Sequence, residues 1–165
     1  MADGAVTLTP PPNYCIDKSS LKPRFALMAR CDTLGAETDP DAPLALITAT
    51  LVPLDDRTKV PNATDLAAAL APDRILRKTD NNGLALVQTE SATGLNGISE
   101  RHWRGVFVVN GILVGLALYA PQDGPASGNS GASILTALAK RTTAQTAARS
   151  AAVAKPEPIA LSNTN

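Results

Sequence analysis

The chain has 165 residues, of which 44% are hydrophobic, so it is long enough for one domain with a buried core. Fifteen basic side chains balance fifteen acidic ones without forming long blocks, which excludes the basic face that a nucleic-acid partner requires. The apolar run 106–120 is too short for a membrane span and is interrupted by Asn110 and Gly111, so we expect no transmembrane segment.

The two ends of the chain differ in composition from its middle. Residues 1–13 contain Pro10, Pro11 and Pro12 in succession, which predicts an extended N-terminal arm. Residues 151–165 lack apolar periodicity, and we expect a disordered tail there. A single domain is expected between them, over 14–150.

The first part of this domain predicts strands. The segment 14–17 is either a short strand or a tucked segment. Residues 24–31 and 44–52 are rich in apolar and β-branched side chains, so both runs predict strands. Their alanines leave helix as the competing interpretation.

Two helices are expected. The first covers 64–70, with Asn62 or Thr64 as its N-cap. The second begins with Ser130 as its cap and ends near Arg149. Its apolar stripe follows the three-to-four spacing of an amphipathic helix, through Ile134, Leu135, Leu138, Ala139 and Thr142.

Two hairpins are expected between these helices. In the first, strands at 74–79 and 84–90 flank a four-residue turn, 80–83. In the second, the pair Asn110 and Gly111 lies between two β-rich runs within 103–119, which is the strongest short-range signal for a type I′ turn.

The element order ββαββββα predicts an α+β protein, with a largely antiparallel sheet of about six strands and an amphipathic C-terminal helix packed on it. The late hairpin on Asn110 and Gly111, the small-residue loop after it and the final helix resemble the Mog1/PsbP-like fold over residues 74–149. The resemblance implies a sheet packed between helices and an accessory role, because most members of that group are assembly factors, accessory subunits or binding proteins. It identifies no functional residue.

Cys15 and Cys31 are the two cysteines of the chain. An even count at short spacing fits a disulfide in an oxidising compartment, while two separate buried thiols remain the alternative. Residues 1–6 are small and loop-like, as at the mature end of an exported protein. We therefore expect a periplasmic or secreted location, with a cytoplasmic one as the alternative.

Ser130 raises the alternative of a small serine hydrolase, because the run from Gly128 to Gly131 resembles the surroundings of a protease nucleophile. Such a nucleophile needs a histidine base, and His102 is the single histidine. A nucleophile elbow would have glycine where the chain has Ala132. The competing interpretation is a helix cap.

His102, Trp103 and Arg104 form a candidate contact with a protein partner, since Trp and Arg are enriched at binding hot spots. The alternative is a tryptophan packed below the sheet end, with Arg104 in solvent. No cofactor is expected, because the sequence has no glycine-rich phosphate loop. No metal is expected either: four acidic residues could offer oxygen ligands, but turn chemistry explains them, namely Asp39, Asp41, Asp55 and Asp56.

The sequence therefore favours a small exported accessory or partner-binding protein without catalytic activity, whose partner is another protein. Two alternatives stay open. One is the serine hydrolase that uses Ser130 and His102, and the other is a peripheral membrane protein, which requires an exposed apolar patch.

Overall fold

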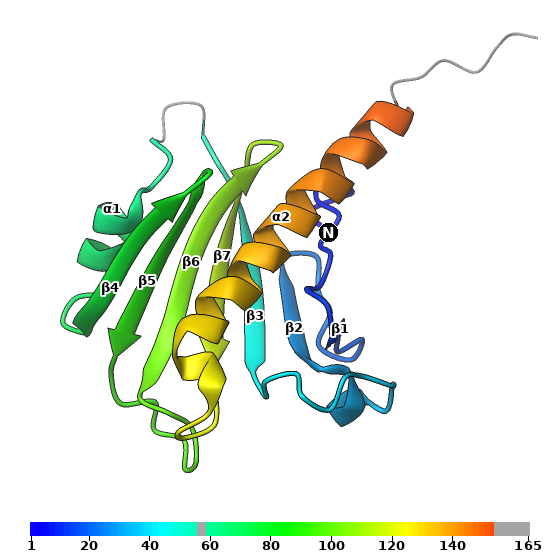
Figure 1. Ribbon diagram of the computed structural model, residues 1–165. Helices are drawn as coiled ribbons and strands as arrows, with labels where there is room; N and C mark the ends of the chain where they lie inside the picture. The colour runs from blue at the N-terminus through cyan, green and yellow to red at the C-terminus, as the bar shows by residue number, and fades with distance from the viewer. Residues whose placement is uncertain (56–58, 154–165) are drawn as a thin grey trace, which may run out of the picture.

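The structure is a computed structural model that describes residues 1–55 and 59–153, and these residues form one seven-stranded antiparallel sheet (Figure 1). The α+β class is confirmed. The sheet has one strand more than the expected six, because residues 14–16 pair with the next strand. In spatial order the strands are β1 (Tyr14–Ile16), β2 (Phe25–Arg30), β3 (Leu46–Pro53), β7 (Ile112–Tyr119), β6 (Arg101–Val109), β5 (Leu84–Glu90) and β4 (Arg74–Asn81).

The two α-helices lie on opposite faces of this sheet (Figure 1). Helix α1 (Ala63–Ala69) begins at Asn62, whose side chain accepts bonds from the backbone N–H groups of Thr64 and Asp65. Asn62 is thus the cap that satisfies the first orphan donors of the helix. Short 3₁₀ turns, η1 (Cys31–Leu34) and η2 (Pro125–Ser127), lie in the loops.

Helix α2 (Asn129–Val153) runs diagonally across one face of the sheet and covers the main core (Figure 1). It is longer than the helix expected from the sequence, since residues 151–153 of the expected tail are helical. The rest of that tail, 154–165, lies outside the described residues. Below α2 the core combines helix and strand side chains, including Trp103, Phe107, Leu116, Leu118, Leu135 and Leu138.

The N-terminal arm lies against α2 and contributes to the core. Val6 is fully buried, and the backbone N–H groups of Thr7 and Thr9 donate to the hydroxyls of Thr146 and Thr142, at 3.0 and 3.1 Å. These bonds explain how two helical threonines can be buried, because a buried hydroxyl needs a hydrogen-bond partner. The arm is therefore a packed part of the fold, although its prolines conceal this in the sequence.

Both expected hairpins are present. Asn110 and Gly111 form the turn between β6 and β7, with φ angles of 48° and 70°. The turn between β4 and β5 is shorter than the expected 80–83, because β4 continues to Asn81 and leaves only Asn82 and Gly83 in the turn, at φ 48° and 80°. In both turns Asn and Gly supply the positive φ angles that two-residue hairpins require.

Gly111→Val is expected to destabilise the protein by about 1–2 kcal/mol, since a β-branched residue resists positive φ. A Cβ atom at Gly111 would have no neighbour within 4 Å, so the effect is due to the backbone alone. Urea denaturation should show a lower midpoint for Gly111→Val than for the control Asn129→Ala, an exposed position outside the sheet. Equal midpoints for the two variants and the parent would contradict the role of this turn.

Candidate partner-binding groove

Strand β6 places consecutive side chains on opposite faces of the sheet, which separates the three residues expected to contact a partner. Trp103 lies under α2, is 1% exposed and donates from Nε1 to the carbonyl oxygen of Gly128, at 2.9 Å. His102 and Arg104 therefore lie on the other face, which we call the α1 side. Trp103 is a core residue and offers no surface to a partner.

The same alternation keeps Ser130 away from His102. Helix α2 begins at Asn129, so Ser130 lies in its first turn on the Trp103 face and does not precede the helix as the expected cap. His102 lies on the α1 side. The structure thus does not bring together the serine and the base that the hydrolase alternative requires.

His102 is buried at 1% exposure, and its Nδ1 lies 2.9 Å from the carbonyl oxygen of Glu100. Its ring stacks on Tyr119, with the ring centroids 5.2 Å apart. Burial lowers the pKa of His102 below its ordinary value, against the opposing effect of the bond to Glu100. A neutral ring that donates from Nδ1 leaves Nε2 as an acceptor, and this buried atom has no partner among the described residues.

Arg104 is partly exposed and lies beside the same tyrosine. Its guanidinium carbon is 5.1 Å from the ring centroid of Tyr119, the geometry of a cation–π contact. Its Nε is buried and has no hydrogen-bond partner in the described part of the chain. Of the three residues expected to contact a partner, Arg104 is the one that reaches the surface.

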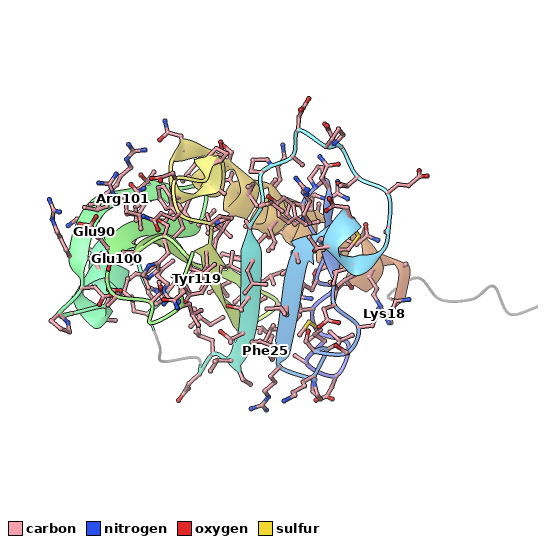
Figure 2. The ribbon with its side chains drawn as sticks, turned by 90° about the horizontal axis from the view of Figure 1, so that it is seen from below. Lys18, Phe25, Glu90, Glu100, Arg101 and Tyr119 are labelled. Atoms are coloured by element: carbon pink, nitrogen blue, oxygen red, sulfur yellow. A yellow bond between two sulfur atoms is a disulfide. The ribbon has the colours of Figure 1, made fainter. Side chains whose placement is uncertain are left out.

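Helix α1 is too short to cover its side of the sheet. It has seven residues and packs on β4 and β5, over a small core of Ala85, Val87 and Val106. The strands β3 and β2 carry apolar side chains on the uncovered part, where Val52 is 54% exposed and Leu46 is 36% exposed. In Figure 2, Phe25 of β2 lies on the side of the sheet away from α2.

A groove of about 460 Å³ lies between α1 and this open face, and we call it the α1 groove. The sheet contributes Thr48, Thr50, Arg104, Val106, Leu113 and Ala117 to its lining. The other wall is formed by Pro61, Asp65, Leu66, Ala69 and Leu70. Its volume and its largely apolar lining with a few polar groups are those of sites that hold a small ligand or a short segment of a partner.

Of the residues that line this groove, Arg104 alone is predicted from the sequence as a candidate contact with a partner. Sequence reasoning missed the other lining residues. A signal was present in β3, where Thr48 and Thr50 alternate with the buried Ile47 and Ala49. That pattern predicts a strand with one buried face and one open face. The sequence does not show that α1 ends before it reaches this open face.

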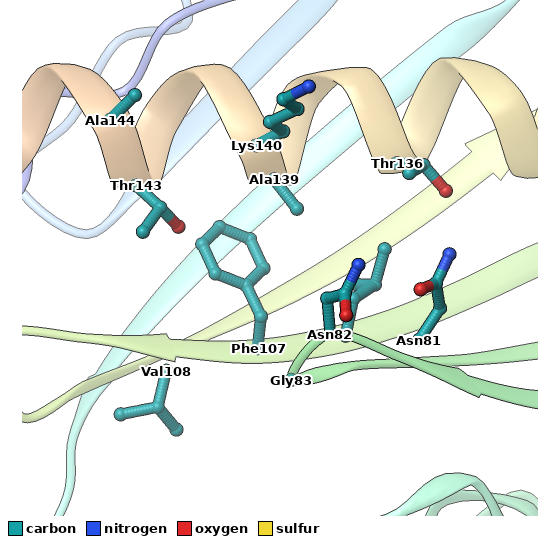
Figure 3. A pocket seen from close by; sticks show the side chains of 11 residues that line it. Asn81, Asn82, Gly83, Phe107, Val108, Thr136, Ala139, Lys140, Thr143 and Ala144 are labelled. Atoms are coloured by element: carbon teal, nitrogen blue, oxygen red, sulfur yellow. The ribbon is translucent and has the colours of Figure 1, made fainter.

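A second cavity of about 420 Å³ lies between α2 and the β4–β5 hairpin (Figure 3). Phe107 rises toward the helix there, below the small residue Ala139, and Lys140 points away from the cavity. The amides of Asn81 and Asn82 lie at its edge. This cavity therefore has no charged group directed into it, unlike the α1 groove.

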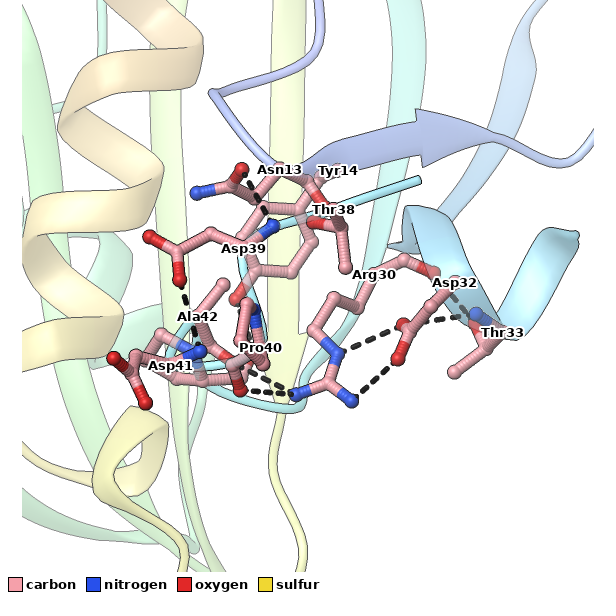
Figure 4. Close-up of polar contacts among 11 residues, drawn as sticks. Asn13, Tyr14, Arg30, Asp32, Thr33, Thr38, Asp39, Pro40, Asp41 and Ala42 are labelled. Atoms are coloured by element: carbon pink, nitrogen blue, oxygen red, sulfur yellow. Dashed lines mark hydrogen bonds and ion pairs between the residues drawn. The ribbon is translucent and has the colours of Figure 1, made fainter. Parts of the chain in front are cut away.

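Asp39 and Asp41, two of the four acidic residues considered as metal ligands, form a local turn contact. The backbone N–H of Asp41 donates to the carboxylate of Asp39 at 3.0 Å, and Arg30 joins Asp32 to the carbonyl oxygen of Ala42 (Figure 4). Within 1–55 and 59–153, no three His, Cys, Asp or Glu side chains are grouped so as to hold a metal ion. Asp56 lies outside those ranges.

Cys15 and Cys31 are joined in a disulfide, which resolves the alternative of two separate buried thiols. The bond ties the edge strand β1 to the end of β2, where η1 begins. It lies on the part of the sheet that is farthest from α1 in the strand order. The disulfide therefore stabilises one edge of the fold and is not part of the α1 groove.

None of the described helices is long and apolar enough to cross a membrane. Comparison with known proteins finds no family model that matches the chain, and no similar curated protein or solved structure.

Proposed function

We propose that this chain is an accessory protein without catalytic activity of its own, and that it binds a partner polypeptide in the α1 groove. The observation that carries the proposal is the uncovered α1 side of the sheet, where an apolar groove of about 460 Å³ contains one cation without an ion-pair partner in the described ranges. Exposed apolar surface of this kind is typical of interaction sites.

Two further features support the proposal. The sheet packed between helices agrees with the Mog1/PsbP-like fold that residues 74–149 resemble, a group that consists mainly of accessory and binding proteins. The disulfide between Cys15 and Cys31 favours an oxidising compartment, so we propose a periplasmic or secreted location. We do not favour the serine hydrolase alternative, because Ser130 and His102 lie on opposite faces of the sheet.

Site-specific photocrosslinking in the native host tests this function. Benzoylphenylalanine at Thr50 or Val52, both exposed beside the groove, is expected to crosslink one polypeptide partner. The matched control is Leu95, which is 60% exposed in the loop after β5 and does not line the groove. Equal crosslinking from Leu95, or none from either groove position, would contradict the proposal. Crosslinks to lipid alone would favour the peripheral membrane alternative.

A further inference from the structure

We propose that Arg104 binds the C-terminal carboxylate of the partner polypeptide, whose last apolar side chains lie in the α1 groove. This inference rests on the function proposed above and names the chemistry that the groove recognises. It depends on the unpaired groups of Arg104, on its position at one end of the groove and on the polar groups beside the apolar walls.

Arg104 has no carboxylate partner in the parts of the chain that the structure describes. The ion pairs there use Arg30, Lys59, Arg74 and Arg101. The Nε–H of Arg104 is buried and donates to no acceptor, which is costly for a charged group. The terminal N–H groups of the same guanidinium are not buried and have no partner in the described ranges, so a carboxylate in the groove can reach them and form paired, charge-assisted hydrogen bonds.

The arginine is also held in place before any ligand binds. Its guanidinium group lies 5.1 Å from the ring centroid of Tyr119, and that ring is stacked on buried His102. A side chain that is already ordered loses less conformational entropy on binding. Asp65, on the opposite wall, is paired with Lys59 at 3.6 Å and is not among the ion-pair partners of Arg104. The cation is therefore available to an anionic ligand.

The position of Arg104 favours a chain end over an acidic side chain within a longer segment. The groove lining along β7 extends from Leu113 to Ala117, and Ala117 is the register partner of Arg104. Beyond this pair, the rings of His102 and Tyr119 stack on each other, and neither residue lines the groove. An anion at Arg104 therefore sits where the groove ends, which suits a terminal carboxylate.

The polar groups of the groove favour a polypeptide over a fatty acid. Thr48, Thr50 and Asp65 lie among the apolar residues of the two walls. Their oxygen atoms can accept bonds from backbone N–H groups of a bound peptide. A hydrocarbon tail would cover these groups without pairing them, which is unfavourable. The groove therefore matches a short apolar peptide that ends in a free carboxylate.

Nuclear magnetic resonance titration of the ¹⁵N-labelled protein tests this inference. The probes are N-acetyl-Leu-Ala-Leu with a free carboxylate, the same peptide with a C-terminal amide, and dodecanoate. The acid is expected to shift the resonances of Leu113 and Ala117, and to shift the Arg104 Nε–H resonance, which reports on the guanidinium to which this group belongs. We expect it to bind at least about ten times more tightly than the amide, which corresponds to the lower end of the range for a hydrogen bond to a charged group.

Two variants show whether Arg104 causes this preference. Arg104→Met should bind the acid and the amide equally, whereas Arg77→Met should keep the preference, because Arg77 bonds Asn129 on the opposite face of the sheet. If Arg104→Met does not fold, the Arg104 Nε–H signal of the parent protein still decides. An acid preference that persists without Arg104, or no shift in the groove with the acid, overturns the inference.

The remaining outcomes separate this inference from the proposed function. Dodecanoate that binds more tightly than the peptide acid and displaces it would overturn the polypeptide terminus as the ligand. Crosslinks from Thr50 and Val52 combined with equal binding of acid and amide would overturn the role of Arg104 and leave the accessory function intact. If Thr50 and Val52 give no crosslinks but the acid is still preferred over the amide, the accessory function is overturned and the role of Arg104 in binding a carboxylate remains.

Discussion

Gly131→Ala is expected to destabilise the protein by about 3 kcal/mol, the upper end of the usual cost of overpacking a core. A Cβ atom at Gly131 would lie 2.1 Å from the carbonyl oxygen of Ala126 and 2.6 Å from Cδ1 of Trp103. The first neighbour is backbone and the second is a fully buried ring, so neither can move away cheaply. The first turn of α2 must therefore shift away from the sheet.

Helix propensity acts in the opposite direction and is too small to compensate. Replacing glycine with alanine inside a helix usually stabilises it by about 1 kcal/mol or less. The clash should dominate, and the melting temperature should fall by about 6–12 °C for a domain of this size. Because Trp103 is the single tryptophan, its fluorescence should also shift to longer wavelength in the folded variant.

Gly128→Ala is the matched control for this prediction. It lies three residues earlier, and its Cβ would meet the carbonyl oxygen of Pro125 at 3.5 Å, an ordinary contact. The substitution keeps the backbone carbonyl that accepts from Trp103. We expect its stability to change by about 0.5 kcal/mol or less. If both variants melt at the temperature of the parent, α2 does not begin against Trp103 as the structure has it.

The strongest local signals in the sequence were confirmed. Asn110 and Gly111 mark the turn between β6 and β7 because few residues adopt positive φ at low cost. The turn at Asn82 and Gly83 follows the same chemistry, but the polar residues before it concealed the end of β4. That strand lies at the edge of the sheet, where polar side chains are tolerated, so polarity was a poor guide to where the turn begins.

The parts that depend on distant residues could not be predicted from local patterns. Val6 lies near three prolines, yet it is buried, because the arm bonds to threonines of α2 more than 130 residues away. The α1 groove depends on the length of α1 and on the register that places Arg104 opposite Ala117. The alternation of His102, Trp103 and Arg104 was visible, but which face α2 covers is decided by tertiary packing.

Loss of the disulfide between Cys15 and Cys31 is expected to destabilise the protein strongly. The two residues are separated by 16 positions, and the bond closes the loop that connects β1 with β2. Closing a loop of this length should stabilise the protein by about 3 kcal/mol in the chain-entropy estimate. The variant with both Cys15→Ala and Cys31→Ala should therefore melt about 6–12 °C below the parent.

The effect should appear at β1, which is held by its pairing with β2 and by the buried Tyr14 and has no second neighbouring strand. This strand has three residues and pairs only with β2, at the edge of the sheet. The hydroxyl of Tyr14 donates to the carbonyl oxygen of Pro43 and anchors one end of the strand. Without the crosslink the strand should open locally, since a short edge strand has ladder bonds to one neighbour and is therefore among the elements of lowest local stability.

A reducing agent separates the effect of the crosslink from the effect of changing two side chains. It should lower the melting temperature of the parent nearly to that of the double alanine variant, and it should leave the variant itself unchanged. Mass spectrometry after alkylation without reduction should find no modified cysteine in protein purified from its native compartment. Two alkylated cysteines there, or a parent melting temperature that does not respond to reduction, would contradict both the stabilising role of the bond and the support it gives to an exported location.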